Sequence, residues 1–182
     1  MTVDDKSDVE LVRQFKSGDS SAFDAIVERF QDRVYRLACV WLYDAQFAAD
    51  ATQEVFIRSY TGLRKFRFRS QPFTWLYRTT RNVCSEFNRV RRAEALDDEP
   101  RDDSFAPEHI VADSERASRV RKLVGRLPER QQEVVMLRIF EDLSVKETAR
   151  AMGCREGTVK ALLHKATNNL KPAMTRMGMA ND

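Results

Sequence analysis

The chain has 182 residues, of which 42% are hydrophobic and 32% are charged, and its net charge is +3. This length suits one large domain or two small ones. Six glycines and five prolines are too few for an all-β protein with many tight turns. No apolar run reaches the roughly 20 residues of a membrane-spanning helix, and the acidic N-terminus lacks a signal segment, so we expect no membrane insertion.

Cysteine and histidine are sparse. Cys39, Cys84 and Cys154 lie far apart without a CxxC pair, and the two histidines are His109 and His164. This pattern favours neither a disulfide framework nor a zinc site, and it is typical of proteins of the reducing cytoplasm. We therefore expect a cytoplasmic protein with no metal site and no cofactor.

The charges alternate in four blocks along the chain. Residues 1–63 carry a net −4, residues 64–92 carry +8, residues 93–115 carry −8 and residues 116–182 carry +7. Two basic blocks on either side of an acidic one are typical of two nucleic-acid surfaces on a shared tether. Charged helix surfaces are the simpler alternative, but blocks that coincide with structural boundaries favour nucleic-acid binding.

Helical spacing dominates the N-terminal half. Apolar residues recur at three- and four-residue steps over residues 23–41, which predicts a long amphipathic helix capped by Ser20 or Ser21. The same spacing predicts helices around residues 9–15, over residues 48–62, and from residue 72 or 73 to about residue 90.

An acidic stretch, residues 94–115, contains two prolines and few apolar side chains. It cannot bury enough surface to offset the entropy of ordering, so we interpret it as a flexible linker between residues 1–93 and residues 116–182. Helical spacing resumes over residues 120–127 and residues 134–140. The predicted fold class is all-α, with two helical domains joined by a flexible acidic linker.

The sharpest local pattern lies near the C-terminus and is typical of a helix-turn-helix. Ser144 and Glu147 form a capping box that starts one helix, and Gly153 supplies the left-handed backbone that ends it. Val159 and Leu162 then bury the second helix against the first. The second helix of such a motif enters the major groove of DNA.

The exposed face of that second helix carries the candidate duplex contacts. Lysine or histidine can donate to guanine, glutamate can accept from cytosine, and arginine or threonine can hold a phosphate. An ordinary solvated helix would also be polar here, but the helix-turn-helix context fixes which face is exposed. The predicted duplex-binding residues are Arg155, Glu156, Thr158, Lys160, Ala161, His164 and Lys165.

Residues 65–78 interleave five aromatic rings with four basic side chains. Exposed rings beside arginines suit unpaired bases, because each base stacks on a ring while the cations hold the backbone. Phe66 and Phe73 could instead belong to the core, with Trp75 half-buried. Phe68, between two arginines, is the ring that we expect to be exposed.

Three stretches carry a resemblance to a known family. They are Asp50-Ala-Thr-Gln-Glu-Val-Phe-Ile-Arg, Phe73-Thr-Trp-Leu-Tyr-Arg-Thr-Thr-Arg-Asn, and Leu127-Pro-Glu-Arg-Gln-Gln-Glu-Val followed by Gly157-Thr-Val-Lys. Over residues 8–171 the chain resembles the extracytoplasmic-function (ECF, group 4) sigma factors of bacterial RNA polymerase. The resemblance implies a non-enzymatic subunit for promoter recognition, promoter opening and transcription initiation.

The resemblance also implies partners and site residues. The implied partners are bacterial core RNA polymerase, promoter DNA and an anti-sigma protein, and the free protein would be a monomer. Contacts with core polymerase are implied for Asp50, Gln53, Glu54 and Phe56. Contacts with the unpaired −10 strand are implied for Lys65, Phe66, Arg67, Phe68, Arg69, Phe73, Thr74, Trp75, Tyr77, Arg78, Arg81 and Asn82. The helix from Arg155 would read the −35 element as duplex.

The chain departs from the family pattern at several positions. On the second helix of the helix-turn-helix, Leu162 stands where the family often has arginine, and Asn168 and Asn169 stand where basic residues are common. The remaining departure lies on the helix implied to bind polymerase. Ala49 occupies one position of an acidic pair that family members usually carry, so only Asp50 remains. Some sigma factors that lack these acids are activated by threonine phosphorylation. Thr52 and Thr61 are therefore candidate regulatory phosphorylation sites, where a phosphate would add roughly −1.5 to −2 charge.

Two other function classes compete with this hypothesis. A stand-alone helix-turn-helix regulator explains residues 144–170 equally well but leaves the aromatic-basic segment unexplained. A recombinase would need a nucleophile among arginines, and Tyr77 with Arg78 and Arg81 is the candidate. That segment is better explained by strand capture, and the chain has no Gly-rich phosphate loop.

Overall fold

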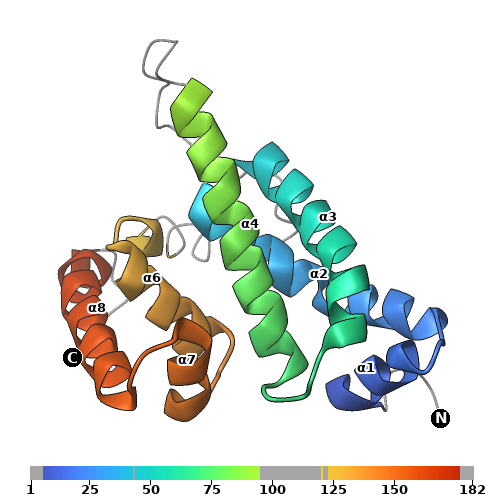
Figure 1. Ribbon diagram of the computed structural model, residues 1–182. Helices are drawn as coiled ribbons and strands as arrows, with labels where there is room; N and C mark the ends of the chain where they lie inside the picture. Colours follow the sequence, from blue (N-terminus) through green and yellow to red (C-terminus); the bar gives the residue numbers. More distant parts are fainter. Residues whose placement is uncertain (1–5, 43, 95–119, 121–122, 177–182) are drawn as a thin grey trace. The chain divides into compact units, whose positions relative to one another are not determined.

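The computed structural model describes residues 6–42, 44–94, 120 and 123–176, and every element within them is a helix (Figure 1). The all-α prediction is confirmed for these residues. The chain forms two compact units, Met1–His109 and Ile110–Asp182. Residues 95–115 of the expected linker lie outside the described residues, so the boundaries of the three predicted parts remain a prediction.

The first unit is a helical cluster. Its elements are α1 (Asp8–Lys16), α2 (Ser21–Leu42), α3 (Ala45–Gly62), the short 3-10 turn η2 (Leu63–Lys65) and α4 (Pro72–Glu94). Helices α2, α3 and α4 pack on one another, and α1 lies against α2 and also contacts η2 and α4. The helices expected around residues 9–15, 23–41 and 48–62, and from residue 72, are all confirmed.

Side chains that accept backbone hydrogen bonds fix where these helices start. Ser7 and Glu10 form a capping box at α1, in which the Glu10 amide donates to Ser7 Oγ at 3.3 Å. At α2 the Ser21 amide donates to the Asp19 carboxylate at 3.0 Å. The Phe23 amide donates to the Ser20 carbonyl at 2.9 Å. Asp19, which the sequence pattern had not indicated, therefore contributes to the start of α2 because its short carboxylate reaches a first amide, and the capping role of Ser20 or Ser21 stays a prediction.

The apolar stripe of α2 forms the centre of this unit. Ile26, Phe30, Val34 and Leu37 are fully buried. The C-terminal end of α2 is held by α4, since Asn88 Nδ2 donates to the Trp41 carbonyl at 3.0 Å and Arg91 Nη1 donates to the Leu42 carbonyl at 2.8 Å. These bonds satisfy carbonyls that a helix end leaves unpaired.

The second unit contains the helix-turn-helix. Its elements are α6 (Glu129–Val135), the π-helical turn η3 (Met136–Phe140), α7 (Val145–Met152) and α8 (Glu156–Arg176). The predicted capping box is present, with the Glu147 amide donating to Ser144 Oγ at 3.2 Å. Gly153 has φ +63°, and Val159 is fully buried. The helix-turn-helix prediction is confirmed.

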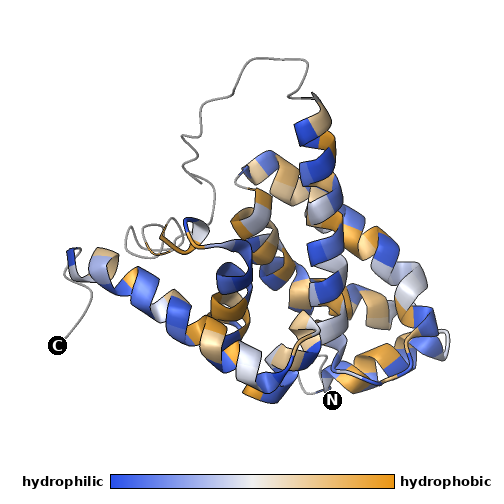
Figure 2. Ribbon diagram, turned by 60° about the vertical axis from the view of Figure 1, so that its left-hand side comes forward, coloured by the Kyte–Doolittle hydropathy of each residue, from blue (hydrophilic) through white to orange (hydrophobic). Residues whose placement is uncertain are grey.

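Hydrophobic and hydrophilic residues alternate along the helices, as expected for amphipathic helices that bury one side (Figure 2). Among the residues that the structure describes, no helix combines the length and the apolar character needed to cross a membrane.

Candidate nucleic-acid and docking surfaces

The seven predicted duplex-binding side chains lie together on one exposed surface at the start of α8. Arg155, Glu156, Thr158, Lys160, Ala161, His164 and Lys165 are all exposed. Val159 and Ala166 form the buried side of the same helix. The sequence pattern therefore predicted correctly which residues of α8 are exposed. Their contacts with DNA remain a prediction.

A buried carboxylate that sequence reasoning missed helps to connect α6 with α7. Glu133 on α6 is 1% exposed and pairs with Arg130, whose Nη1 lies 2.6 Å from Glu133 Oε2. Arg130 Nη2 also donates to the Met152 carbonyl at 3.2 Å, which ties α6 to the end of α7. A separate hydrogen bond connects α6 with α8, since Asn169 Nδ2 donates to Gln131 Oε1 at 2.8 Å.

Four of the residues implied for the −10 strand are core residues instead. Phe66, Phe73, Thr74 and Tyr77 are 6%, 3%, 3% and 0% exposed. Phe73 stacks on Phe30 with ring centroids 5.9 Å apart, and Tyr77 contacts Trp41 at 5.6 Å. These side chains lack a free face for a base, which corrects their interpretation as strand contacts. The physical reason is the helical repeat of α4, which turns positions 73 and 77 toward α2.

The remaining residues implied for the strand are accessible. Lys65, Arg67, Phe68, Arg69, Arg78 and Asn82 are exposed, and Trp75 and Arg81 are half-buried. Phe68 is 36% exposed, as expected from its position between two arginines. The indole of Trp75 lies so close to the end of α3 that a Cβ added at Gly62 would approach its ring atoms to 2.6 Å.

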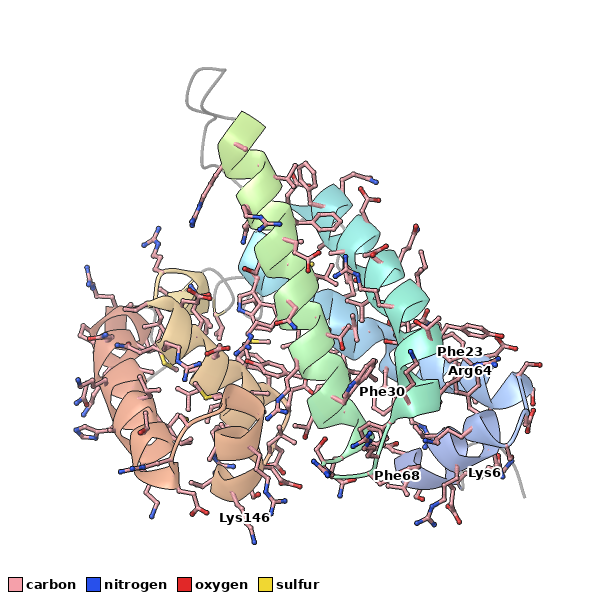
Figure 3. The ribbon with its side chains drawn as sticks, in the orientation of Figure 1. Lys6, Phe23, Phe30, Arg64, Phe68 and Lys146 are labelled. Carbon is pink, nitrogen blue, oxygen red and sulfur yellow. The ribbon has the colours of Figure 1, made fainter. Side chains whose placement is uncertain are left out.

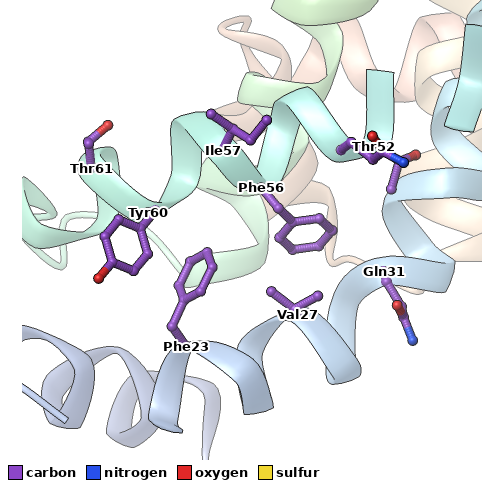
Figure 4. A pocket seen from close by; sticks show the side chains of 9 residues that line it. Phe23, Val27, Gln31, Thr52, Phe56, Ile57, Tyr60 and Thr61 are labelled. Atoms are coloured by element: carbon purple, nitrogen blue, oxygen red, sulfur yellow. The ribbon is translucent and has the colours of Figure 1, made fainter. Parts of the chain in front are cut away.

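An apolar pocket of about 750 Å³ lies between α2 and α3 (Figure 4). It brings together Gln53 and Phe56, which were expected to contact polymerase, and the candidate phosphorylation sites Thr52 and Thr61. Sequence reasoning missed its other lining residues, which are Phe23, Val27, Gln31, Ile57 and Tyr60. The apolar residues at 23, 27, 56 and 60 belong to the helical spacing described above, but that spacing does not show that the two helices bring them together around one pocket.

Glu54, also expected to contact polymerase, belongs to an ion-pair network within the unit. Arg58 lies 2.6 Å from Glu54 on the same helix and 2.8 Å from Glu86 on α4, measured between nitrogen and oxygen. Its hydrogen bonds lower the pKa of the Glu86 carboxyl. Glu54 is half-buried in this network, whereas Asp50 and Gln53 are exposed.

The hydroxyls of the two candidate threonines both hydrogen-bond to the helix backbone. Thr52 Oγ1 donates to the Ala48 carbonyl at 2.7 Å, and Thr61 Oγ1 donates to the Arg58 carbonyl at 3.2 Å. Thr52 is half-buried and Thr61 is exposed. Thr61 is therefore the more accessible of the two to a modifying enzyme.

A helix-turn-helix with a polar, exposed second helix, together with a helical unit that presents an aromatic ring among basic side chains, defines a helix-turn-helix DNA-binding protein. Comparison with known proteins narrows this class. Residues 26–94 match the Sigma-70 region 2 family, and residues 117–170 match the Sigma-70 region 4 family.

Two curated relatives resemble the chain over nearly its whole length. The RNA polymerase sigma-H factor of Pseudomonas aeruginosa is 32% identical, over 93% of this chain and 94% of that protein. The ECF RNA polymerase sigma factor SigM of Mycobacterium tuberculosis is also 32% identical, over 91% of this chain and 84% of that protein. The chain belongs to the ECF sigma factors of RNA polymerase, which confirms the resemblance seen in its motifs.

The fold is similar to that of a solved sigma factor. The structure of the sigma factor RpoE in complex with the anti-sigma factor NepR from Bartonella quintana has a TM-score of 0.74 and 21% identity. The match covers 84% of this chain and 96% of that one. The function that follows from the family is promoter recognition and transcription initiation as a sigma subunit.

Proposed function

We propose that this sigma factor uses two differently built surfaces on one promoter. The exposed face of α8 reads the −35 element as duplex, and the basic segment around Phe68 holds the unpaired −10 strand. The single observation that carries the proposal is that both surfaces are exposed, with a polar helix face in one unit and an aromatic ring among cations in the other. A duplex offers its base edges to a helix, whereas unpaired bases offer their faces to a ring.

Opening then needs no catalysis by the chain itself. Capture of an unpaired base on Phe68 lowers the free energy of the open state, and stacking of about 1–3 kcal/mol per base compensates for lost base stacking in the duplex. Lys65, Arg67 and Arg69 supply positive charge for the phosphates on either side of that base. The chain is proposed to act in this way in the cytoplasm, as a binding subunit and not as an enzyme.

Core RNA polymerase is the proposed occupant of the apolar pocket between α2 and α3. Ile57 is 66% exposed and Tyr60 is 41% exposed at its rim, which leaves apolar surface for a partner to cover. Gln53 and Asp50 supply exposed polar groups on the same helix. An anti-sigma protein that covered this surface would prevent the monomeric sigma factor from binding core polymerase.

The test is transcription by purified bacterial core polymerase, with and without this protein, on a library of promoter fragments. Initiation that requires the protein, at fragments sharing one upstream motif, is the expected result. It would also provide the promoter sequence for all later experiments. Binding of duplex DNA without any initiation would favour a stand-alone helix-turn-helix regulator and would overturn the proposal.

A third outcome would concern the missing acidic charge at Ala49. The unmodified protein would then support no initiation, whereas Thr52→Glu or Thr61→Glu would restore it. This result would mean that polymerase binding needs a negative charge on α3. Thr52→Val and Thr61→Val are the matched controls, because they fill similar space without the charge. Phosphorylation as the regulator is supported if only the charged variants initiate.

A further inference from the structure

We propose that α1 is part of the −10 strand site, with Arg13 as a phosphate contact and Lys16 as both a positioning residue and a phosphate contact. The inference rests on the proposed capture of the strand around Phe68, and it adds a helix far from that segment in sequence. No motif in the N-terminal residues pointed to it, because the site is assembled by the packing of α1 against η2 and α4.

The backbone at Phe68 needs support from outside its own segment. Its φ of +53° lies in the left-handed region, which is costly for a bulky side chain. Such a conformation persists only where the surrounding contacts determine it, and it is concentrated at ligand sites. One of these contacts is the edge-on packing of the Phe68 ring against Phe66, with centroids 5.1 Å apart.

The other contacts come from α1. Lys16 Nζ donates to the Phe66 carbonyl at 2.6 Å, across 50 positions of sequence. Lys16 Nζ and Arg13 Cζ each lie 5.5 Å from the centroid of the Phe68 ring. Figure 3 shows Phe68 in the space between the N-terminal end of α4 and α1. Two cations of α1 therefore help to fix the orientation of the Phe68 ring and of its exposed face.

These cations are available for a strand as well as for the ring. Both side chains are exposed. The carboxylate one turn before Arg13, Glu10, is engaged in the capping box with the Ser7 amide and hydroxyl at 2.8 Å each. Lys16 has three N–H donors and gives one to the Phe66 carbonyl.

A base that stacks on Phe68 brings its phosphates to the rim of the ring. Cations held beside the same ring are then next to the sugar-phosphate backbone, in addition to Arg67 and Arg69 of the segment itself. Such contacts do not read sequence, but they increase affinity and make it depend on salt. The expected ligand is the sugar-phosphate backbone of the unpaired strand, next to the base that stacks on Phe68.

The test uses holoenzyme formed from core polymerase and the full-length protein. The probe is the promoter fragment selected in the transcription experiment, prepared as a fork with its non-template strand unpaired from the −10 element onward. The variant is Arg13→Gln with Lys16→Gln. The matched control is Arg92→Gln, an exposed arginine 20 residues along α4 from Pro72, or about 30 Å along the helix axis.

The double variant is expected to bind the fork about tenfold more weakly at low salt, with the slope of log affinity against log salt flatter by about 1.4. Fully duplex fragments and core polymerase should be bound as by the wild type, and Arg92→Gln should match the wild type on the fork. Lys16→Arg should recover most of the loss due to Lys16→Gln, since it keeps both the charge and the donor to the Phe66 carbonyl.

The outcomes separate this inference from the function on which it rests. If the double variant binds the fork with the affinity and salt slope of Arg92→Gln, α1 is not part of the site although strand capture stands. If wild-type holoenzyme does not distinguish fork from duplex, strand capture and this inference both fail. A loss of core binding by the double variant that equals its loss on the fork would show a structural role for α1 and would also overturn the inference.

Discussion

The two nucleic-acid surfaces differ in how their side chains are held. Six of the seven predicted duplex-binding residues lie on α8 and Arg155 lies directly before it. The other side of this helix is buried, so exposure follows directly from the helical repeat. Around Phe68 the rings of one short segment divide between core and surface, and Phe68 is the most exposed of the five aromatic residues at 65–78. A motif of known packing thus predicts a surface residue by residue, whereas an aromatic-basic composition predicts only that a surface is present.

The largest effect that tests this comparison is expected at Tyr77. Its side chain is fully buried and contacts Trp41 at 5.6 Å between ring centroids. Tyr77→Ala should lower the free energy of unfolding by about 3–5 kcal/mol, as is usual for loss of a buried aromatic ring. Thermal and urea unfolding followed by circular dichroism would measure it.

Lys160→Ala is the matched variant from the other surface. Lys160 is exposed on α8, so its removal should change stability by less than about 0.5 kcal/mol. If Tyr77→Ala unfolds like the wild type but loses binding to the unpaired strand, Tyr77 is a strand contact after all.

The next effect concerns DNA rather than stability. Phe68→Ala should reduce affinity for the forked promoter by about 1–3 kcal/mol, the usual value of one stacked base, while leaving affinity for duplex unchanged. Lys160→Ala should do the reverse, with a loss on duplex that diminishes in high salt. Permanganate reactivity of unpaired thymines and duplex binding, measured on the same fragment, separate the two steps. Equal loss of duplex binding in both variants would contradict two separate surfaces.

The fold itself could largely be predicted from the sequence, because its helices are amphipathic and their ends carry recognisable signals. Gly62 ends α3 and Pro72 starts α4, as the pattern indicated. The pocket between α2 and α3 could not be predicted in the same way. It depends on the crossing of two helices, which places Phe23 beside Tyr60 with ring centroids 5.1 Å apart.

The same limit explains why α1 was not recognised as part of a site. Periodicity gives the buried face of α1 correctly, with Leu11, Val12 and Phe15 inside. It cannot show that the cations on its other side meet a segment about 50 residues away. Contacts of this kind are set by tertiary packing and not by local sequence.

A third prediction concerns the close approach between α3 and Trp75. Gly62→Ala should cost about 1–3 kcal/mol of stability, because a Cβ there would lie 2.6 Å from the indole ring and the ring must move. Gly157→Ala in the first turn of α8 is the matched control, since nothing lies within 4 Å of the added atom. That control should be neutral or should stabilise by up to about 1 kcal/mol.

The cause can be checked with a second substitution. Trp75→Phe in the Gly62→Ala background removes the ring atoms that collide and should recover part of the lost stability, a coupling that a double-mutant cycle measures. Strictly additive losses would mean that Gly62 is needed for a reason other than its contact with Trp75.

The smallest effects concern two capping boxes of the same kind, one in each unit. Ser7 with Glu10 and Ser144 with Glu147 both form capping boxes. Ser144→Ala should cost about 1 kcal/mol, the usual value of an N-cap, and should affect unfolding of the second unit. Ser7→Ala should shift unfolding of the first unit in the same direction. Differential scanning calorimetry of both variants would show whether the two units unfold separately, and equal shifts of a single transition would show that they do not.

The effect of Ser144→Ala should also depend on pH. Hydrogen bonds from Ser144 lower the pKa of the Glu147 carboxyl below its ordinary value of 4.5. A lowered carboxyl pKa stabilises the folded state above pH 4.5, and this contribution disappears as the pH falls through the folded-state pKa. The difference between wild type and Ser144→Ala should therefore be constant near neutral pH and decrease below pH 4.5. A difference that grows in acid would mean that the protonated carboxyl, and not the carboxylate, makes the capping box.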